Sequence, residues 1–243
     1  MNKQIERHDI LVHVIERLTR EFPALLSERR IFLKLLSFVN VLTGTMRGAI
    51  FKSLERYLQI CPQVDLVEVS KSIQADYDDI LADISDENQQ NFILLVTSIV
   101  KLNKASGTEL LTKVIPRLKP LFAGNKNDLS RALFYDLMVY IYDNFDHFKP
   151  IAKSSLIHGL SDPSKEIKEK LIQYWNSTAR LSLDPFLRLE QLLSLLYDQD
   201  EESVWLNNAI FLLLQVSQTS ADFTRKIFDE PLTNCRFDPL HIN

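Results

Sequence analysis

Apolar residues recur along most of the chain at the spacing i, i+4, i+7, i+8, which places them on one face of an α-helix. Clear stripes of this kind begin at Ile31, Ile50, Ile73, Phe92, Leu133, Leu189 and Trp205, and weaker ones begin at Leu110 and Ala152. No segment of comparable length alternates apolar and polar residues with period two, the pattern of a strand. The chain is therefore predicted to be all-α, with about eleven helices.

The stripes are regularly spaced. Alternate stripes begin at residues 31, 73, 110, 152 and 189, at intervals of 42 or 37 residues. HEAT-type units are helix pairs that repeat every ~40–47 residues. One such pair cannot bury its apolar face alone, so it needs neighbours on both sides. The spacing predicts a HEAT-like α-solenoid (an α-α superhelix) over residues 1–228. Residues 229–243, where the stripes stop, are expected to be an irregular segment at the end of a fragment.

The sharpest local signal is the turn at Asp162-Pro163. An apolar helix should end at Gly159-Leu160. Asp162 should then cap the next helix, with Pro163 in its first position, since aspartate and proline favour these two places. The new helix carries Ile167, Leu171, Tyr174 and Trp175 on one stripe, and we expect Trp175 to be structural.

Other breaks carry turn residues. Ser106-Gly107 is expected to separate two helices, Gly124–Asn127 to form a turn, and Pro150 and Asp184-Pro185 to start helices. Pro116 lies inside a stripe, where it should kink or end the helix because proline lacks the N–H that the helix uses.

Composition narrows the range of functions. The 243 residues carry a formal net charge of −4, so the chain lacks the basic excess that binding along a nucleic-acid backbone normally requires. We therefore expect little direct DNA binding by this chain alone. The two cysteines, Cys61 and Cys235, are too few for a disulfide framework, which favours a reducing compartment. The longest apolar run, Ala209–Leu214, is far shorter than the ~20 residues of a membrane span.

No catalytic, cofactor-binding or metal-binding residues are predicted. The five histidines form no zinc-type pair, and no glycine-rich phosphate loop is present. The acidic clusters at residues 76–83 and 198–202 are interpreted as solvated helix ends and loops. Ser217-Gln218 is interpreted as a polar pair at a helix end, and Ser217, which follows an apolar stripe, is expected to stay unmodified.

The last third of the chain resembles a known family. Six segments occur in an order that is similar to the circular cradle of the phosphatidylinositol-3-kinase-related kinases, in their DNA-dependent branch. They are Ser155–Ile167, Gln173–Asn176, Ala179–Leu181, Leu187–Leu189, Leu192–Tyr197 and the closing stretch Phe228–Phe237. The residues themselves match the family over about 150–240, whereas residues 1–150 match it only in the predicted arrangement of helices. Glu230 and Thr233 depart from the family pattern, which suggests a distant relative.

The resemblance implies a scaffold role within a much longer protein. Members of this branch are nuclear serine/threonine kinases, recruited to DNA ends by the Ku heterodimer in non-homologous end joining. Their ATP- and magnesium-dependent catalytic domain would lie outside this fragment, because no position here matches a kinase motif. Other segments of the parent kinase would be the direct partners of this chain, with no membrane involved.

Two other hypotheses stay open. The chain could be an independent HEAT adaptor that holds a partner protein or peptide in its concave groove. It could also be an enzyme, which would need converging titratable groups that the sequence does not offer. Continuation of the reading frame past Asn243 into kinase motifs would separate the scaffold from the adaptor.

Overall fold

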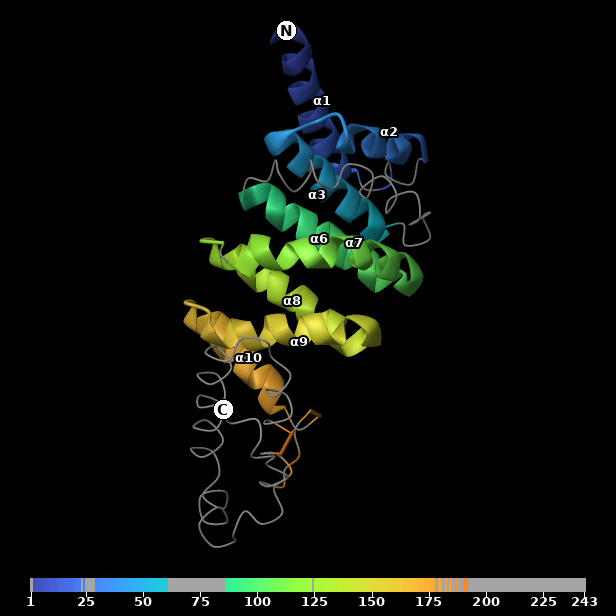
Figure 1. Cartoon of the computed structure of the whole chain (residues 1–243). Coiled ribbons are helices and arrows are strands. Elements are labelled where there is room, and N and C mark those ends of the chain that lie inside the picture. The colour runs from blue at the N-terminus through green and yellow to red at the C-terminus, as the bar shows by residue number, and fades with distance from the viewer. Residues whose placement is uncertain are drawn as a thin grey trace, which may run out of the picture. The chain divides into compact units, whose positions relative to one another are not determined.

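The computed structural model describes residues 2–22, 24, 29–60, 86–123 and 125–177, together with residues 179, 180, 182, 184, 187, 190 and 191. These residues form eight α-helices and two short 3-10 helices, and no strand occurs among them (Figure 1). The all-α prediction is therefore confirmed for this part of the chain. The total of eleven helices and the boundary at residue 228 stay predictions.

The chain divides into two compact units, Met1–Tyr140 and Ile141–Asn243. Unit 1 contains α1 (Asn2–Glu21), α2 (Arg29–Val39), α3 (Gly44–Ile60), α6 (Asp86–Leu102), α7 (Lys104–Ala123) and most of α8 (Asp128–Asn144). Unit 2 contains the end of α8, η2 (Asp146–Phe148), α9 (Lys149–His158), η3 (Gly159–Ser161) and α10 (Lys165–Asn176). Within unit 1, α3 packs against α1, α2 and α6, and α6 packs against α7.

Three helices share one register. α3, α6 and α8 begin at Gly44, Asp86 and Asp128, so each start lies 42 residues after the previous one. Their buried apolar positions recur at the same interval, in the sets Ile50, Phe92 and Phe134; Phe51, Ile93 and Tyr135; and Leu54, Val96 and Met138. Because the period is the same in all three helices, they bury corresponding faces. This register also corrects the stripe predicted for α8, since Phe134 is buried and Leu133 is only half-buried.

The turn between α2 and α3 depends on a glycine. The amides of Val41 and Leu42 donate to the carbonyl of Phe38 and so close the last turn of α2. The chain then enters α3 through Gly44, whose φ of 58° lies in the left-handed region that side chains disfavour. Phe32 of α2 and Tyr57 of α3 stack with their ring centres 4.5 Å apart.

The break between α6 and α7 falls at Asn103 rather than at Ser106-Gly107, which lie inside α7. The Oδ1 atom of Asn103 accepts a hydrogen bond from the Ser106 amide at 3.0 Å and caps the new helix. Gly107 has a packing role: a Cβ atom built there would lie 3.0 Å from the Cα atom of Val100. The glycine that suggested a break therefore permits two helices to approach closely.

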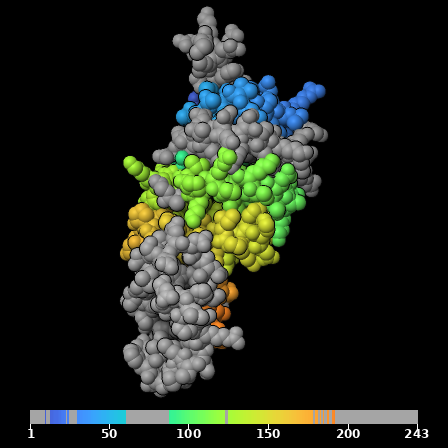
Figure 2. Space-filling model, viewed as in Figure 1, coloured from blue at the N-terminus to red at the C-terminus, as the bar shows by residue number. Residues whose placement is uncertain are grey.

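Helix α7 runs from Lys104 to Ala123 through both Pro116 and Pro120. Of the two effects predicted for Pro116, a kink or an end of the helix, the end does not occur. Each proline removes the hydrogen bond to the carbonyl four residues earlier, which affects Thr112 and Pro116. All three residues are exposed and lie one turn apart on the same face. Water can therefore form hydrogen bonds with the two carbonyls that the prolines leave without a helical partner. The surface of this helix is visible in green in Figure 2.

The Asp162-Pro163 turn forms as expected, but α10 begins two residues later, at Lys165. The carboxylate of Asp162 accepts a hydrogen bond from the Ser164 amide at 2.8 Å, which fixes a turn before the helix rather than capping it. Ser164 takes the cap position, and its carbonyl accepts the first helical bond, from Lys168. Pro163 thus lies outside the helix. By contrast, Pro150 lies in the first turn of α9, as predicted.

Helix α1 is an element that no predicted stripe marks. Ile10, Val14 and Leu18 of α1, and Phe22 directly after it, are exposed, whereas Ile15 is half-buried. The helix packs against α3, where Glu16 pairs with Lys52. The first predicted stripe starts only at Ile31. Among the side chains of α1 that the structure describes, Thr19 alone is buried.

Candidate functional site

Buried polar side chains near the helix ends are the main chemical feature of the described residues. No group of three or more His, Cys, Asp or Glu side chains there is arranged to hold a metal ion. No described helix is long and apolar enough to span a bilayer. The predicted acidic clusters, Trp205 and Ser217 lie outside the described residues. The next question is what partners the buried polar side chains at the helix ends have.

The fourth residue of α3, α6 and α8 is long, polar and buried in every case. These residues are Arg47, Gln89 and Arg131, with 4%, 8% and 3% of their surface exposed. They are spaced by the same 42 residues as the helix starts. A buried polar group is costly unless it has hydrogen-bond partners, so three such residues at equivalent positions indicate a repeated structural role.

The two arginines hold the turn that precedes their own helix. The Nε atom of Arg47 donates to the carbonyl of Leu42 at 2.7 Å. The Nη1 atom of Arg131 donates to the carbonyl of Asn125 at 2.6 Å, and its Nη2 atom donates to Asp128 at 2.7 Å. Guanidinium groups suit this task because they present several donors in a fixed plane. Each arginine therefore ties the connecting turn to the first turn of the next helix.

Amide side chains join one helix start to the next. The Asn88 side chain donates to the Gly44 carbonyl, which links α6 to α3. The Asn125 side chain donates to Oε1 of Gln89, and Gln90 donates to the Ser130 hydroxyl at 3.2 Å. We call these five residues, Asn88, Gln89, Gln90, Asn125 and Ser130, the amide ladder. It crosses from α3 through α6 to the start of α8, and all its members lie in unit 1.

One contact makes the ladder sensitive to side-chain size. Gly48 of α3 faces Asn88, and a Cβ atom built on Gly48 would lie 2.0 Å from the Oδ1 atom of Asn88. That oxygen is buried and accepts no hydrogen bond within the described part of the chain. A glycine is therefore needed for the Asn88 amide to reach the Gly44 carbonyl.

In unit 2 a carboxylate, a guanidinium group and an aromatic ring come together. The hydroxyl of Tyr174 donates to Oδ1 of Asp143 at 2.9 Å, and Arg180 donates to Oδ2 of the same carboxylate at 2.7 Å. The Arg180 guanidinium also lies 3.7 Å from the centre of the Tyr174 ring. We call these three residues the clasp. It ties the segment after α10 to the last turn of α8, within unit 2.

The clasp changes the acidity of Tyr174. Partial burial raises the pKa of the Tyr174 hydroxyl, and the hydrogen bond to Asp143 raises it further, because both favour the protonated form. Arg180 acts in the opposite direction on this pKa but does not outweigh them. In the neutral range Tyr174 is therefore a hydrogen-bond donor, which is the state that the clasp requires.

Trp175 lies beside the clasp and is 2% exposed, which confirms its predicted structural position. Its ring meets Tyr142 and Tyr174 edge to face, at centre distances of 5.3 and 5.2 Å. The indole N–H is buried and has no hydrogen-bond partner among the described residues. Ile167 and Leu171, on the same stripe, are buried with it.

Sequence reasoning found the apolar stripes but missed the amide ladder and the clasp. A signal existed for the buried fourth residues Arg47, Gln89 and Arg131, since they follow the 42-residue interval already visible in the stripes. The clasp had none, because Asp143, Tyr174 and Arg180 are separated by intervals that follow no helical period.

These features define an all-helical segment whose polar groups stabilise helix packing. The family model described as DNA-PKcs, CC5 matches residues 1–243, and the chain belongs to this family. The resemblance noted in residues 150–240 therefore extends over the whole chain.

The relatives that the chain matches have descriptions consistent with this family. The DNA-dependent protein kinase catalytic subunit of Dictyostelium discoideum is 38% identical over 125 residues, which cover 48% of this chain and 3% of that protein. The proteins of the same description from Xenopus laevis and Mus musculus are 25% and 26% identical, each over 99% of this chain and 6% of their own length. The chain thus spans only a small part of the length of these relatives.

Proposed function

We propose that this chain is a HEAT-like α-solenoid segment of a DNA-dependent serine/threonine protein kinase, and that it acts as scaffold in the circular cradle. Membership of the CC5 family supports the assignment. The role is mechanical: stacked helices form a stiff arc that holds other parts of the kinase at fixed distances.

The observation that carries the proposal is the common register of α3, α6 and α8. The buried apolar sets and the buried fourth residues Arg47, Gln89 and Arg131 return every 42 residues. In a solenoid each unit contacts mainly its neighbours, so equivalent positions must present equivalent groups. A catalytic domain would instead bring unlike titratable groups together in one pocket.

The kinase as a whole supplies the biochemical setting. We infer a nuclear protein that is recruited to DNA ends with the Ku heterodimer and acts in double-strand break repair by non-homologous end joining. ATP and magnesium would bind a catalytic domain outside this chain. With a net charge of −4, this segment would contribute little direct DNA affinity and would act through other segments of the same polypeptide.

The native polypeptide tests the proposal. An antibody against residues 125–177 should precipitate from source cells a polypeptide many times longer than this chain, with protein kinase activity that DNA ends stimulate. A native product of only this length, without kinase activity, would favour the independent HEAT adaptor and refute the scaffold assignment.

The isolated chain gives a second test. It should bind duplex DNA weakly and without sequence preference at physiological salt, because it lacks a basic excess. Sub-micromolar binding in a fluorescence anisotropy titration would instead make this segment a DNA-contacting surface.

A further inference from the structure

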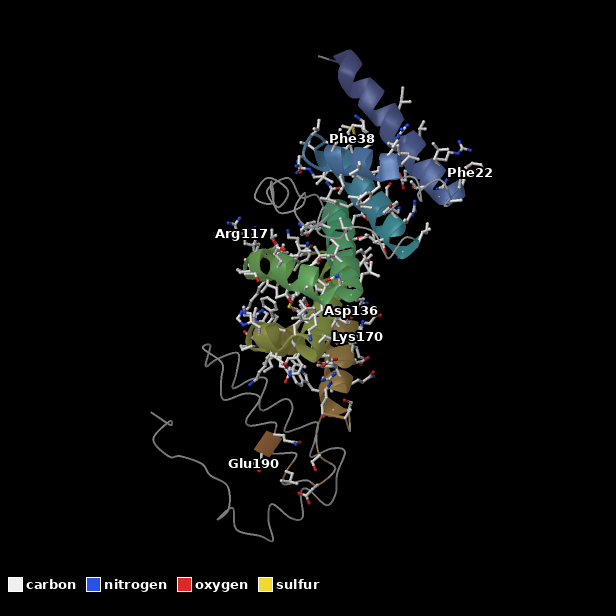
Figure 3. The ribbon with its side chains drawn as sticks, turned by 90° about the vertical axis from the view of Figure 1, so that its right-hand side faces the viewer. Phe22, Phe38, Arg117, Asp136, Lys170 and Glu190 are labelled. Carbon is white, nitrogen blue, oxygen red and sulfur yellow. The ribbon has the colours of Figure 1, made fainter. Side chains whose placement is uncertain are left out.

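Helix α1 presents an apolar surface that nothing in the described part of the chain covers. Ile10, Val14, Leu18 and Phe22 are 64%, 46%, 40% and 55% exposed. They follow one another at intervals of four residues, so they form a single slanting ridge along the helix. Phe22 marks its end in Figure 3. We call these four residues the α1 stripe.

The opposite face of α1 already has a partner. Glu16 lies two residues after Val14 and two before Leu18, about 200° around the helix from each, and is therefore on the other side from the ridge. Glu16 pairs with Lys52 of α3 at 3.5 Å. Since α1 packs on α3 through this face, the α1 stripe is left outward as a second interface.

One edge of the stripe is basic. Arg17 and Arg20 are exposed, and both pair with the single carboxylate of Glu21, at 3.0 and 3.7 Å. Two guanidinium groups that share one carboxylate leave a positive edge, which favours an acidic partner. A second copy of this chain fits poorly, because in a symmetric antiparallel pair of α1 helices the two basic edges would meet.

We propose that the α1 stripe docks an amphipathic helix from another segment of the same polypeptide, with aliphatic side chains on the ridge and Asp or Glu along the side that faces Arg17 and Arg20. This inference rests on the proposed function, which places the chain in a longer protein. The matched relatives extend far beyond the region they share with this chain, which covers only 3% or 6% of their length. Ridges spaced by four residues favour helix partners that cross at about −50°.

Photo-cross-linking in the full-length native polypeptide tests the proposal. A photoreactive phenylalanine analogue would replace Leu18, and the same analogue at exposed Glu109 of α7 would be the control. We expect cross-links from position 18 to a single peptide outside residues 1–243 that carries aliphatic and acidic residues, and no such product from position 109. The double change Arg17→Glu and Arg20→Glu should reduce this cross-link, because it places like charges along the docking edge.

The outcomes separate the two proposals. Cross-links only between copies of residues 1–30 would overturn the intramolecular partner in favour of a dimer. Absence of any product above the control in a long polypeptide would overturn the docking surface while leaving the scaffold assignment intact. A native polypeptide no longer than this chain would overturn the scaffold assignment itself.

Discussion

The two units stabilise their helix connections with different chemistry. Unit 1 uses neutral amide bonds, such as those of Asn88 and Asn125, together with arginines that are almost completely buried. Unit 2 uses the clasp, whose Arg180 and Asp143 side chains keep 24% and 33% of their surface exposed. Both arrangements hold a turn against a helix. In unit 1 the Arg131 side chain is buried although its partner Asp128 is exposed, whereas in unit 2 both members of the ion pair keep part of their surface exposed.

The difference indicates how each unit should respond to its surroundings. Hydrogen bonds between neutral amide groups carry no net charge, so salt and pH have little effect on them. A solvent-exposed ion pair is weakened by salt and depends on the protonation of its members. We therefore expect unit 1 to keep its register across solution conditions and unit 2 to loosen at its clasp first.

The largest effect is expected in unit 2 from Trp175→Ala. Removal of a buried aromatic side chain leaves a cavity, and such changes cost about 3–5 kcal/mol of unfolding free energy. Urea unfolding, monitored by the hydrogen exchange of the backbone amides in α10, would measure the loss of unfolding free energy. Trp175→Phe, which keeps a ring between Tyr142 and Tyr174, should cost less. An unchanged midpoint for the alanine variant would show that the stripe of α10 does not carry the stability of unit 2.

The second effect concerns unit 1. Gly48→Ala would push the Asn88 amide away from the Gly44 carbonyl, and leaving a buried polar group without its partner costs about 1–3 kcal/mol. In an Asn88→Ala background the same change should be neutral or gain up to about 1 kcal/mol, because alanine favours a helix more than glycine does. A double-mutant cycle by urea unfolding measures the coupling. Additive effects of the two changes would mean that the close contact does not matter.

A smaller effect should distinguish the two chemistries directly. Arg180→Ala removes an ion pair and a stacking contact, with an expected loss of about 0.5–1 kcal/mol that shrinks at high salt. The matched variant in unit 1 is Asn125→Ala, whose loss should not depend on salt. Thermal melts at low salt and at 1 M salt, a range over which the screening length falls to about 3 Å, would compare them. Equal salt dependence would remove the distinction between the units.

The smallest effect appears only in alkaline solution. The folded state raises the pKa of Tyr174 above its ordinary value of 10.0, so the stabilisation from this group is fully present below that pH and is lost as the pH rises above it. Tyr174→Phe has no proton to lose, so its stability should fall less steeply over this range. Unfolding free energies from pH 8 upward would test this, and parallel curves for the two proteins would rule out a role for the hydroxyl.

The sequence predicts the features that recur with a helical period and misses the contacts that do not recur. Stripes such as those of α3 and α6 are visible because burial of one helix face forces a helical period on the apolar residues. Among the described side chains of α1 only Thr19 is buried, so they show no buried stripe. Helix α10 starts at Lys165, later than predicted, because Asp162 forms a turn instead of a cap. The side-chain bonds of the clasp join residues whose closeness depends on the tertiary fold alone.

The 42-residue interval of α3, α6 and α8 restricts how this region can change length during evolution. If residues 86–127 were deleted from the gene, Arg131 would take the place of Gln89 and Phe134 the place of Phe92, so each would enter an equivalent environment. A deletion one residue shorter within the helices would turn the following side chains by about 100° and direct apolar rows toward water. Homologous genes should therefore gain or lose sequence here in whole helix pairs or within the turns, and seldom within a helix.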